Sequence, residues 1–243
     1  MFNGSRFDQI IEIMLKELKK KVFEVNIALR ERGLAIMTWG NASAIDRGQG
    51  LVIIKPGGVP YDQMQPEDMV VTDMDGKVVD GRWQPSSDTL THIVLYRNFH
   101  GIGGIVHTHA EWATSWAQAG RGIPVYGTTH ADYFYGEVPC TRPMTRKETK
   151  TDYELNTGNV IVERFKGIDP LQMPGVLVHA HAPFTWGPDV EKALESALVL
   201  EEIAKMAFRT EILGNRYSVG QHLLDRHYLR KHGKDAYYGQ RKG

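Results

Sequence analysis

The sequence predicts a single α/β domain in which a mixed or mainly antiparallel sheet is covered by helices. A chain of 243 residues is long enough to bury one sizeable core. Strand-like segments alternate with amphipathic helices along it. Two tight hairpin signals near its start argue against a purely parallel sheet, because parallel strands need long crossover connections. We therefore expect one domain over residues 1–243, with 1–6 as a loose extension and 237–243 as a C-terminal tail.

The first third of the chain shows one long helix followed by two hairpins. Apolar side chains recur every three or four residues over 7–32, and Gly33 is well placed to end that helix. The turns of the two hairpins are predicted at 47–50 and at Asp75-Gly76. The strands expected beside these turns cover 42–46, 51–55, 69–72 and 77–79.

The remainder alternates between helices and buried strands. Ser86-Ser87-Asp88 starts a helix that runs to about Asn98, because its side-chain oxygens are suited to the N-cap position. Further helices are expected over 111–119, 157–166, 189–210 and 221–231. Apolar strands are expected over 104–109 and 175–181.

Composition excludes several classes of protein. Lys and Arg together number 29, as do Asp and Glu, so no global field favours nucleic acid or an anionic membrane. The single cysteine, Cys140, cannot form an internal disulfide, which fits a reducing compartment. No secretory signal opens the chain and no apolar run has the length that spans a bilayer. We expect a cytoplasmic protein that binds any anion locally.

Four of the ten histidines form two His-x-His pairs, His107 with His109 and His179 with His181. Residues two apart on a strand point to the same face, so each pair could chelate one ion. Neutral imidazoles suit zinc, and a catalytic zinc needs about three protein ligands and an open position. A pair satisfied by hydrogen bonds inside a sheet is the alternative. Two pairs at the ends of apolar strands favour a metal, but spacing does not tell which histidines bind.

Two segments have the character of an anion site. Ser86-Ser87-Asp88 offers hydroxyls and free N–H groups at a helix start, which attracts phosphate through oriented amides. A simple capping sequence is the other interpretation, and local evidence favours it. Lys55-Pro56-Gly57-Gly58 is either a backbone nest with a lysine for an anion or a turn after a strand.

The sequence offers few candidate proton carriers. Asp132 lies in Thr-Thr-His-Ala-Asp-Tyr, and its carboxylate would titrate near neutrality if it were partly desolvated. A surface or helix-capping aspartate is the simpler interpretation. Tyr237-Tyr238 near the C-terminus is either a packing anchor or a frayed end, and nothing local singles it out.

Longer ordered segments contain most of these residues: TWGN at 38–41, IKP at 54–56, PSSDT at 85–89, GIVHTH at 104–109, GTTHADYF at 127–134, and the ending HYLRKHG through AYYGQ at 227–240. Together they resemble the class II aldolase/epimerase superfamily, and within it the L-ribulose-5-phosphate 4-epimerase family. The similarity extends from about residue 15 to residue 240. It implies a three-layer α/β/α domain around a mainly antiparallel sheet, assembled as a fourfold homotetramer with active sites between neighbouring subunits.

The resemblance also assigns roles to the histidines. It implies one divalent metal ion per subunit, Zn²⁺ by preference with Mn²⁺ or Co²⁺ as alternatives. The ligands that match the family are His107, His109 and His181, with Asp88 as the acidic residue at the metal. His179 would then be a neighbour of the site.

Substrate recognition and proton transfer are implied in the same way. The positions that match the family's phosphate and substrate site, together with the lysine of the possible anion nest, are Gly40, Asn41, Lys55, Gly57, Gly58, Ser86 and Ser87. The catalytic proton carriers match Asp132 and Tyr238, both contributed by the adjacent subunit, so the tail 237–243 would reach the active site. Two departures stand out: Gly57 replaces the usual serine, and His181 is followed by Ala182 instead of glycine.

The activity that the resemblance implies is interconversion of the ketopentose phosphates L-ribulose 5-phosphate and D-xylulose 5-phosphate. The C3–C4 bond would break and re-form through an enediolate, with the metal as Lewis acid. A class II sugar-phosphate aldolase is the alternative, and a non-catalytic binding protein that keeps the fold is a remote one. Asp88 in place of glutamate, together with the Thr-Thr-His-Ala-Asp-Tyr run, favours the epimerase, and the complete set of site residues argues against the binding protein.

Overall fold

The computed structural model describes residues 6–214 and 217–238, with side chains from residue 12 onward. Of the expected loose extension 1–6, only Arg6 is described, and it begins the first helix. Residues 239–243 of the expected tail lie outside the described residues. Within the two described stretches, no helix is both long and apolar enough to cross a membrane.

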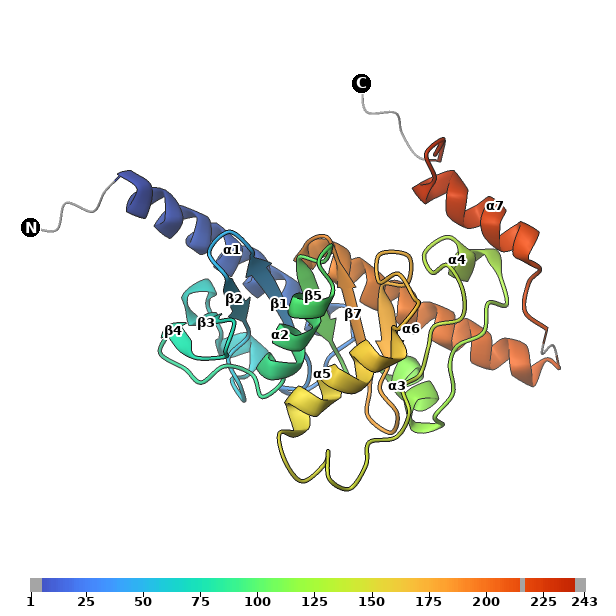
Figure 1. Cartoon of the computed structure of the whole chain (residues 1–243), viewed down its shortest axis with the longest axis horizontal. Coiled ribbons are helices and arrows are strands. Elements are labelled where there is room, and N and C mark those ends of the chain that lie inside the picture. Colours follow the sequence, from blue (N-terminus) through green and yellow to red (C-terminus); the bar gives the residue numbers. More distant parts are fainter. Residues whose placement is uncertain (1–5, 215–216, 239–243) are drawn as a thin grey trace, which may run out of the picture.

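Helices and strands alternate as expected (Figure 1). The helices are α1 (Arg6–Glu31), α2 (Thr89–Asn98), α3 (Glu111–Gln118), α4 (Thr128–Ala131), α5 (Tyr153–Arg164), α6 (Val190–Ile212) and α7 (Gln221–His232), with short 3-10 helices η1 (Tyr61–Gln63) and η2 (Pro66–Asp68). The strands are β1 (Asn41–Asp46), β2 (Leu51–Ile54), β3 (Val70–Asp73), β4 (Val78–Asp80), β5 (Gly104–His107), β6 (Gly175–Leu177) and β7 (Pro183–Gly187).

All seven of these strands form one sheet in the order β4-β3-β2-β1-β5-β7-β6, and each pairing is antiparallel. Both expected hairpins are confirmed, because β1 pairs with β2 and β3 pairs with β4. β5 is an inner strand, between β1 and β7. The expected histidine pair therefore begins on a strand that is hydrogen-bonded on both sides.

Helices cover both faces of the sheet. Consecutive residues of a strand point to opposite faces, and Val52 and Ile53 of β2 belong to two different core clusters. The cluster that contains Val52 also holds side chains of α2, α3 and α5, whereas the cluster of Ile53 holds those of α1. α6 contributes to both (Figure 1). The expected helix-covered, mainly antiparallel α/β architecture is confirmed.

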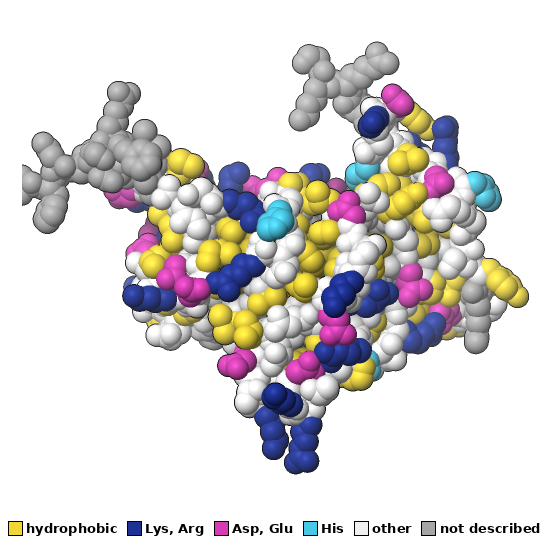
Figure 2. Space-filling model, viewed as in Figure 1, with side chains coloured by type: hydrophobic (Ala, Val, Ile, Leu, Met, Phe, Trp, Pro, Cys, Tyr) yellow, Lys and Arg dark blue, Asp and Glu magenta, His cyan; other side chains and the backbone are white. Residues whose placement is uncertain are grey.

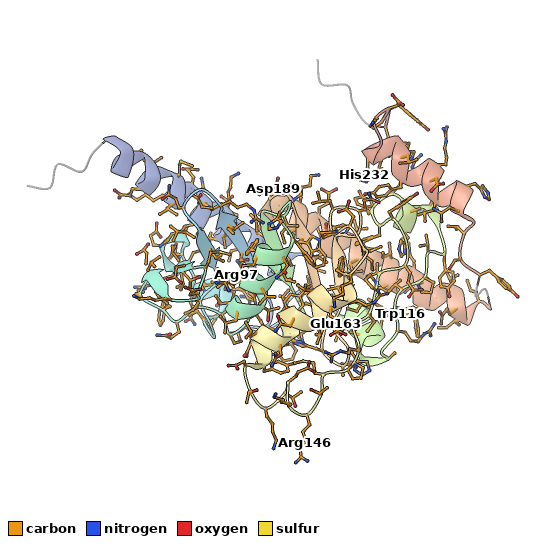
Figure 3. The ribbon with its side chains drawn as sticks, in the orientation of Figure 1. Arg97, Trp116, Arg146, Glu163, Asp189 and His232 are labelled. Atoms are coloured by element: carbon orange, nitrogen blue, oxygen red, sulfur yellow. The ribbon has the colours of Figure 1, made fainter. Side chains whose placement is uncertain are left out.

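The charged surface is mixed. On the face shown in Figure 2, Lys and Arg side chains are interspersed with Asp and Glu side chains. Figure 3 labels Arg146 at the lower tip of the molecule, in the segment between β5 and β6 that precedes α5. A mixed surface agrees with the balanced composition and leaves anion binding to local groups.

Some elements differ from the expectation. The strand expected over 175–181 stops at Leu177, and β7 was not anticipated. The two are joined by a tight turn in which Ala180 has φ 56°, and the sequence His-Ala-His-Ala carries none of the usual glycine or asparagine turn signals. α5 begins at Tyr153, four residues before the expected start, and ends at Arg164. The short elements η1, η2 and α4 were also missed.

Close packing of α5 against α2 yields a prediction about stability. A Cβ added to Gly158 of α5 would lie 2.6 Å from Val94 Cβ. Gly158→Ala should therefore destabilise the protein by about 1–3 kcal/mol through overpacking, although alanine is the better helix former. Urea denaturation followed by circular dichroism measures this change. Asn159→Ala, at an exposed position on the same helix, is the control and should be neutral or slightly stabilising; a stabilised Gly158→Ala variant would contradict the packing argument.

Candidate metal centre

Three histidine side chains converge at the end of the inner strand β5. His107 is the last residue of β5, His109 follows two residues later, and His181 lies in the turn between β6 and β7. One nitrogen from each ring lies within 4.8 Å of the other two. The ring centroids are 4.9 to 5.2 Å apart. His107 is buried, His181 is half-buried and His109 is exposed, so the group opens toward solvent on one side.

His107 is held by strand β7. In the pairing of β5 with β7, Phe184 lies opposite His107, and its ring stacks on the imidazole at 4.1 Å with an interplanar angle of 18°. His107 Nδ1 lies 2.9 Å from the carbonyl oxygen of Pro183. A carbonyl only accepts, so Nδ1 carries a proton, which leaves Nε2 as the nitrogen that could bind a metal ion. A backbone carbonyl that fixes the tautomer in this way is typical of a metal-binding histidine.

The electrostatics of the three rings fit a cation. Burial lowers the pKa of His181 to about 4 and also lowers the pKa of His109, with neighbouring histidines acting in the same direction. Both imidazoles are therefore neutral at pH 7. His181 Nδ1 is a buried nitrogen without a hydrogen-bond partner among the described residues. Three imidazole nitrogens with one open side suit a divalent transition-metal ion.

His179 takes no part in this cluster. The expectation that His179 and His181 share a strand face is wrong, because both lie in the turn after β6. The ring of His179 packs against Gly120, where an added Cβ would lie 2.8 Å from the imidazole. The separation of His179 from His181 agrees with the role of neighbour that the resemblance implied.

Asp88 lies beside the histidines as an ionised carboxylate. It occupies the N-cap position of α2 but makes no side-chain capping bond, contrary to expectation. Its Oδ2 accepts a hydrogen bond of 2.7 Å from Asn41 Nδ2 and lies 3.9 Å from His107 Nε2. Burial favours the neutral acid, but His107, His92 and Asn41 together lower the pKa of Asp88. Because its oxygens are not in the 4.8 Å group, its role as a metal ligand stays a prediction.

Gly40 and Asn41 are placed by direct backbone contact with the histidine strand. Asn41 of β1 pairs with His107 of β5. Gly40 has φ 81°, and an added Cβ would lie 2.9 Å from the carbonyl oxygen of His107, so no other residue fits there without strain. The buried hydroxyl of Tyr61 lies 2.8 and 3.0 Å from the carbonyl oxygens of Trp39 and Gly40.

The structure brings the two candidate anion segments together. Ser86 N–H donates to the carbonyl oxygen of Lys55 at 3.0 Å, and Gly57 N–H donates to that of Gln84 at 3.0 Å. Ser86 is buried and Ser87 is exposed. These contacts place both segments next to Asp88, which immediately follows Ser87.

Two of the expected anion donors already have protein partners. The ammonium of Lys55 is buried and donates to the carbonyl oxygens of Pro56 and Val59 at 3.2 Å each. Burial lowers the pKa of Lys55 to about 8. Since Gly57 N–H is also engaged, the groups that present themselves for an anion are the Ser87 hydroxyl and the open backbone at Gly58, where an added Cβ would meet no atom within 4 Å.

Asp132, at the end of α4, and Tyr238, beyond the end of α7, form a separate group around side chains of α7. The Asp132 carboxylate accepts hydrogen bonds from Arg230 (2.9 Å) and His227 (3.0 Å) and lies 3.5 Å from the ammonium of Lys231. Burial opposes ionisation, but the bonds from Arg230 and His227 lower the pKa of Asp132. The Tyr238 ring lies over Arg230 and Lys231, 4.7 Å from each cation.

The same two cations therefore hold both candidate proton carriers. Among the described residues, no contact of Asp132 or Tyr238 reaches the histidine cluster. Figure 1 shows α4 and α7 packed together to one side of the sheet. His232, labelled in Figure 3, adds a bond of 3.0 Å between its Nε2 and the carbonyl oxygen of Asp132.

Sequence reasoning missed residues around the cluster. The ring of Tyr153, at the start of α5, lies 6.2 Å from that of His181. His92 is fully buried with its Nδ1 2.7 Å from Ser43 Oγ, and burial lowers its pKa to about 3. Neither residue belongs to a recognisable motif, and only the long-range packing of α2 and α5 brings them to the centre.

A helix-covered antiparallel sheet with three imidazoles converging at the end of its inner strand β5 defines the class: an α/β domain with a candidate metal centre. Comparison with known proteins agrees with this. The chain matches the class II aldolase and adducin N-terminal domain over residues 20–208. It is 51% identical over 228 residues to proteins named L-ribulose-5-phosphate 4-epimerase UlaF from Salmonella paratyphi B and Salmonella typhi, covering 93% of this chain and 100% of theirs.

Solved structures show the same fold. The chain is similar to an L-fuculose 1-phosphate aldolase with a TM-score of 0.76 and 22% identity, covering 88% of this chain and 95% of that one. It is also similar to YgbL, a putative aldolase/epimerase/decarboxylase from Klebsiella pneumoniae, with a TM-score of 0.68 and 22% identity over 87% and 98% of the two chains. The chain belongs to the class II aldolase family, as its sequence motifs indicated.

The turn that carries His181 leads to a second prediction. Ala180 has φ 56°, which costs an alanine about 1–2 kcal/mol relative to glycine. Ala180→Gly should therefore be neutral or stabilise by up to about 1 kcal/mol after the entropy of glycine is counted. Ala182 is buried and is not among the positive-φ residues, so Ala182→Gly should destabilise by about 1–2 kcal/mol. Thermal unfolding of both variants checks the opposite signs; equal destabilisation would contradict the turn geometry.

Proposed function

We propose that this protein interconverts L-ribulose 5-phosphate and D-xylulose 5-phosphate by breaking and re-forming the C3–C4 bond. The observation that carries the proposal is its 51% identity to 4-epimerases over their whole length. The histidine cluster and Asp88 add a chemical reason, since cleavage next to a ketone needs an electrophile at the carbonyl. The lone thiol of Cys140 supports the expected cytoplasmic location.

The residues that would hold the metal are His107, His109 and His181, with Asp88 beside them. A divalent ion bound there polarises the substrate carbonyl as a Lewis acid. The nitrogen-rich donor set favours Zn²⁺, while Mn²⁺ and Co²⁺ remain compatible with it.

The other residues of the centre bind and orient the sugar phosphate. Asn41 fixes the Asp88 carboxylate through a bond of 2.7 Å, and Gly40 leaves room beside His107. The phosphate is assigned to the surface of the two paired segments, which comprises Lys55, Gly57, Gly58, Ser86 and Ser87. Because the Lys55 ammonium is buried, its contribution is a positive charge below this surface.

Asp132 and Tyr238 are assigned to proton transfer. As C3–C4 breaks, the C4 hydroxyl loses its proton to one of them and the C4 fragment becomes an aldehyde. The aldehyde turns, the bond re-forms on its other face, and the second group returns a proton to the C4 oxygen. Asp132, whose pKa is lowered, suits the role of acceptor at neutral pH.

The site is proposed to be shared between subunits of a homotetramer. In this chain both proton carriers are held by Arg230 of α7 and contact none of the described metal-site residues. An adjacent copy that brings its α4 and α7 to the histidine cluster would complete the site. In this arrangement the described part of the tail, which includes Tyr238, contributes to the active site.

Product analysis tests the reaction. Protein loaded with Zn²⁺ is incubated with L-ribulose 5-phosphate, and every product is identified. The proposal expects D-xylulose 5-phosphate as the sole product. The fold of an L-fuculose 1-phosphate aldolase favours aldol cleavage as the alternative, and net accumulation of glycolaldehyde phosphate with a three-carbon ketose would establish it.

Removing single imidazoles tests the metal ligands. His107→Ala, His109→Ala and His181→Ala should each lose most of the bound metal and of the activity, because three ligands cannot be reduced to two without a large loss of affinity. His179→Ala is the matched control and should keep its metal, since that ring packs on Gly120. Elemental analysis after dialysis measures the content; metal loss in His179→Ala with retention in His181→Ala would reverse the assignment.

Mixed assemblies test the shared site. Asp88→Asn and Tyr238→Phe chains should each be nearly inactive alone and recover part of the activity when co-assembled, because some sites then combine an intact metal half with an intact proton-carrier half. Tyr237→Phe, which alters the neighbouring exposed tyrosine, should remain active. Verified mixed tetramers without any recovery would rule out sharing.

A further inference from the structure

The N-terminus of α3 is capped by a residue from a distant helix. Ala110, at the N-cap position, has no side-chain oxygen that could accept from the first N–H groups of the helix. The carboxylate of Glu201, on α6, supplies both acceptors: one oxygen takes the N–H of Trp112 and the other takes that of Ala113, each at 2.9 Å. A negative charge is also favourable at this end of a helix.

Further contacts fix α3 to α6 along its length. Trp116 Nε1, on the residue labelled in Figure 3, donates to the carbonyl oxygen of Ala204 at 3.0 Å. Just beyond the end of α3, Arg121 forms a bidentate pair with Glu211 at 2.6 and 3.0 Å. With Glu201 at its start, α3 is thus anchored to α6 at three levels.

The anchored helix determines where His109 lies. Only three residues, Thr108 to Ala110, join the end of β5 to the start of α3, and a chain spans at most about 3.6 Å per residue. His107 is fixed by the Pro183 carbonyl and the Phe184 ring. The His109 ring, by contrast, is exposed and makes no hydrogen bond within residues 12–214 and 217–238. Apart from ring contacts with Trp39, His107 and His181, its position depends on its backbone.

We infer that Glu201 is a positioning residue of the metal centre, which acts by holding the start of α3 and through it the imidazole of His109. The inference rests on the metal centre of the proposed function. Glu201 touches no metal ligand; its effect passes through the backbone of Trp112 and Ala113. A carboxylate is required because it offers two equivalent acceptors, whereas glutamine offers one.

The affinity of the metal-free protein for Zn²⁺ tests the inference. Measured by competition with a chelating dye well below the unfolding temperature, Glu201→Ala should weaken binding by roughly 10- to 100-fold, as is usual for residues that orient metal ligands. Glu201→Gln should fall between this variant and the wild type. Glu202→Ala removes the same charge from the adjacent, exposed position of α6 and should leave the affinity unchanged.

A double-mutant cycle separates positioning from general stability. In a His109→Ala background, Glu201→Ala should weaken the remaining Zn²⁺ affinity no further, because the ring that Glu201 positions is gone. An equal loss in both backgrounds, or a lower unfolding temperature with unchanged affinity, would overturn the inference. If Glu201→Ala fails to fold, the same comparison is made with Glu201→Gln.

The wild-type protein separates the two hypotheses. If it has no affinity for Zn²⁺, both the metal centre and the inference are refuted. If it binds Zn²⁺ normally and the Glu201 variants have the same affinity, only the inference is refuted.

Discussion

The register of β1 against β5, which sets Asn41 opposite His107, is the constraint on which the candidate centre depends. It brings the Asn41 amide within 2.7 Å of the Asp88 carboxylate and so ties the start of α2 to the histidine strand. A slip of one residue would turn Asn41 to the other face of the sheet. Gly40 protects this register, because its backbone lies so close to the carbonyl of His107 that a Cβ would approach to 2.9 Å.

Burial has opposite effects on the pKa values of the imidazoles and of the carboxylate in the centre. Desolvation lowers the pKa values of His109 and His181 and so keeps their nitrogens available as donors. The same desolvation would protonate Asp88, but the neighbouring histidines and the Asn41 amide outweigh it. The neutral rings of His109 and His181 therefore lie beside an ionised carboxylate at pH 7. Such a pairing has the charge and the donor types that a divalent cation requires.

The sequence predicted the features that depend on neighbouring residues and missed those that depend on contacts between distant segments. Periodicity located α1 and α6, turn residues located both hairpins, and the spacing of His107 and His109 located half of the centre. β7 was missed because its sequence, Pro-Phe-Thr-Trp-Gly, is buried throughout and shows no alternation of apolar and polar residues. The choice of His181 over His179 follows from a turn with a left-handed alanine, which spacing does not encode. Glu201 and Trp112 are 89 residues apart, and no periodicity links them.

Backbone strain is concentrated where the chain meets the centre. The positive-φ residues other than glycine in the described chain are Met37, Asp152 and Ala180. They precede, respectively, the Gly40–Asn41 corner, the Tyr153 ring and His181. Each of these backbone conformations costs about 1–3 kcal/mol and persists only where the surrounding structure enforces it.

For Ala180 the enforcing contacts are two backbone hydrogen bonds. The N–H of Ala180 donates to the carbonyl oxygen of Ala117 at 2.9 Å, and the N–H of His181 donates to the carbonyl oxygen of Val178 at 3.0 Å. The Ala117 carbonyl belongs to α3, so the helix that Glu201 anchors through Trp112 and Ala113 also supports the turn of His181. Two of the three imidazoles thus depend on the placement of one short helix, while the third, His107, is fixed by the pairing of β5 with β1 and β7.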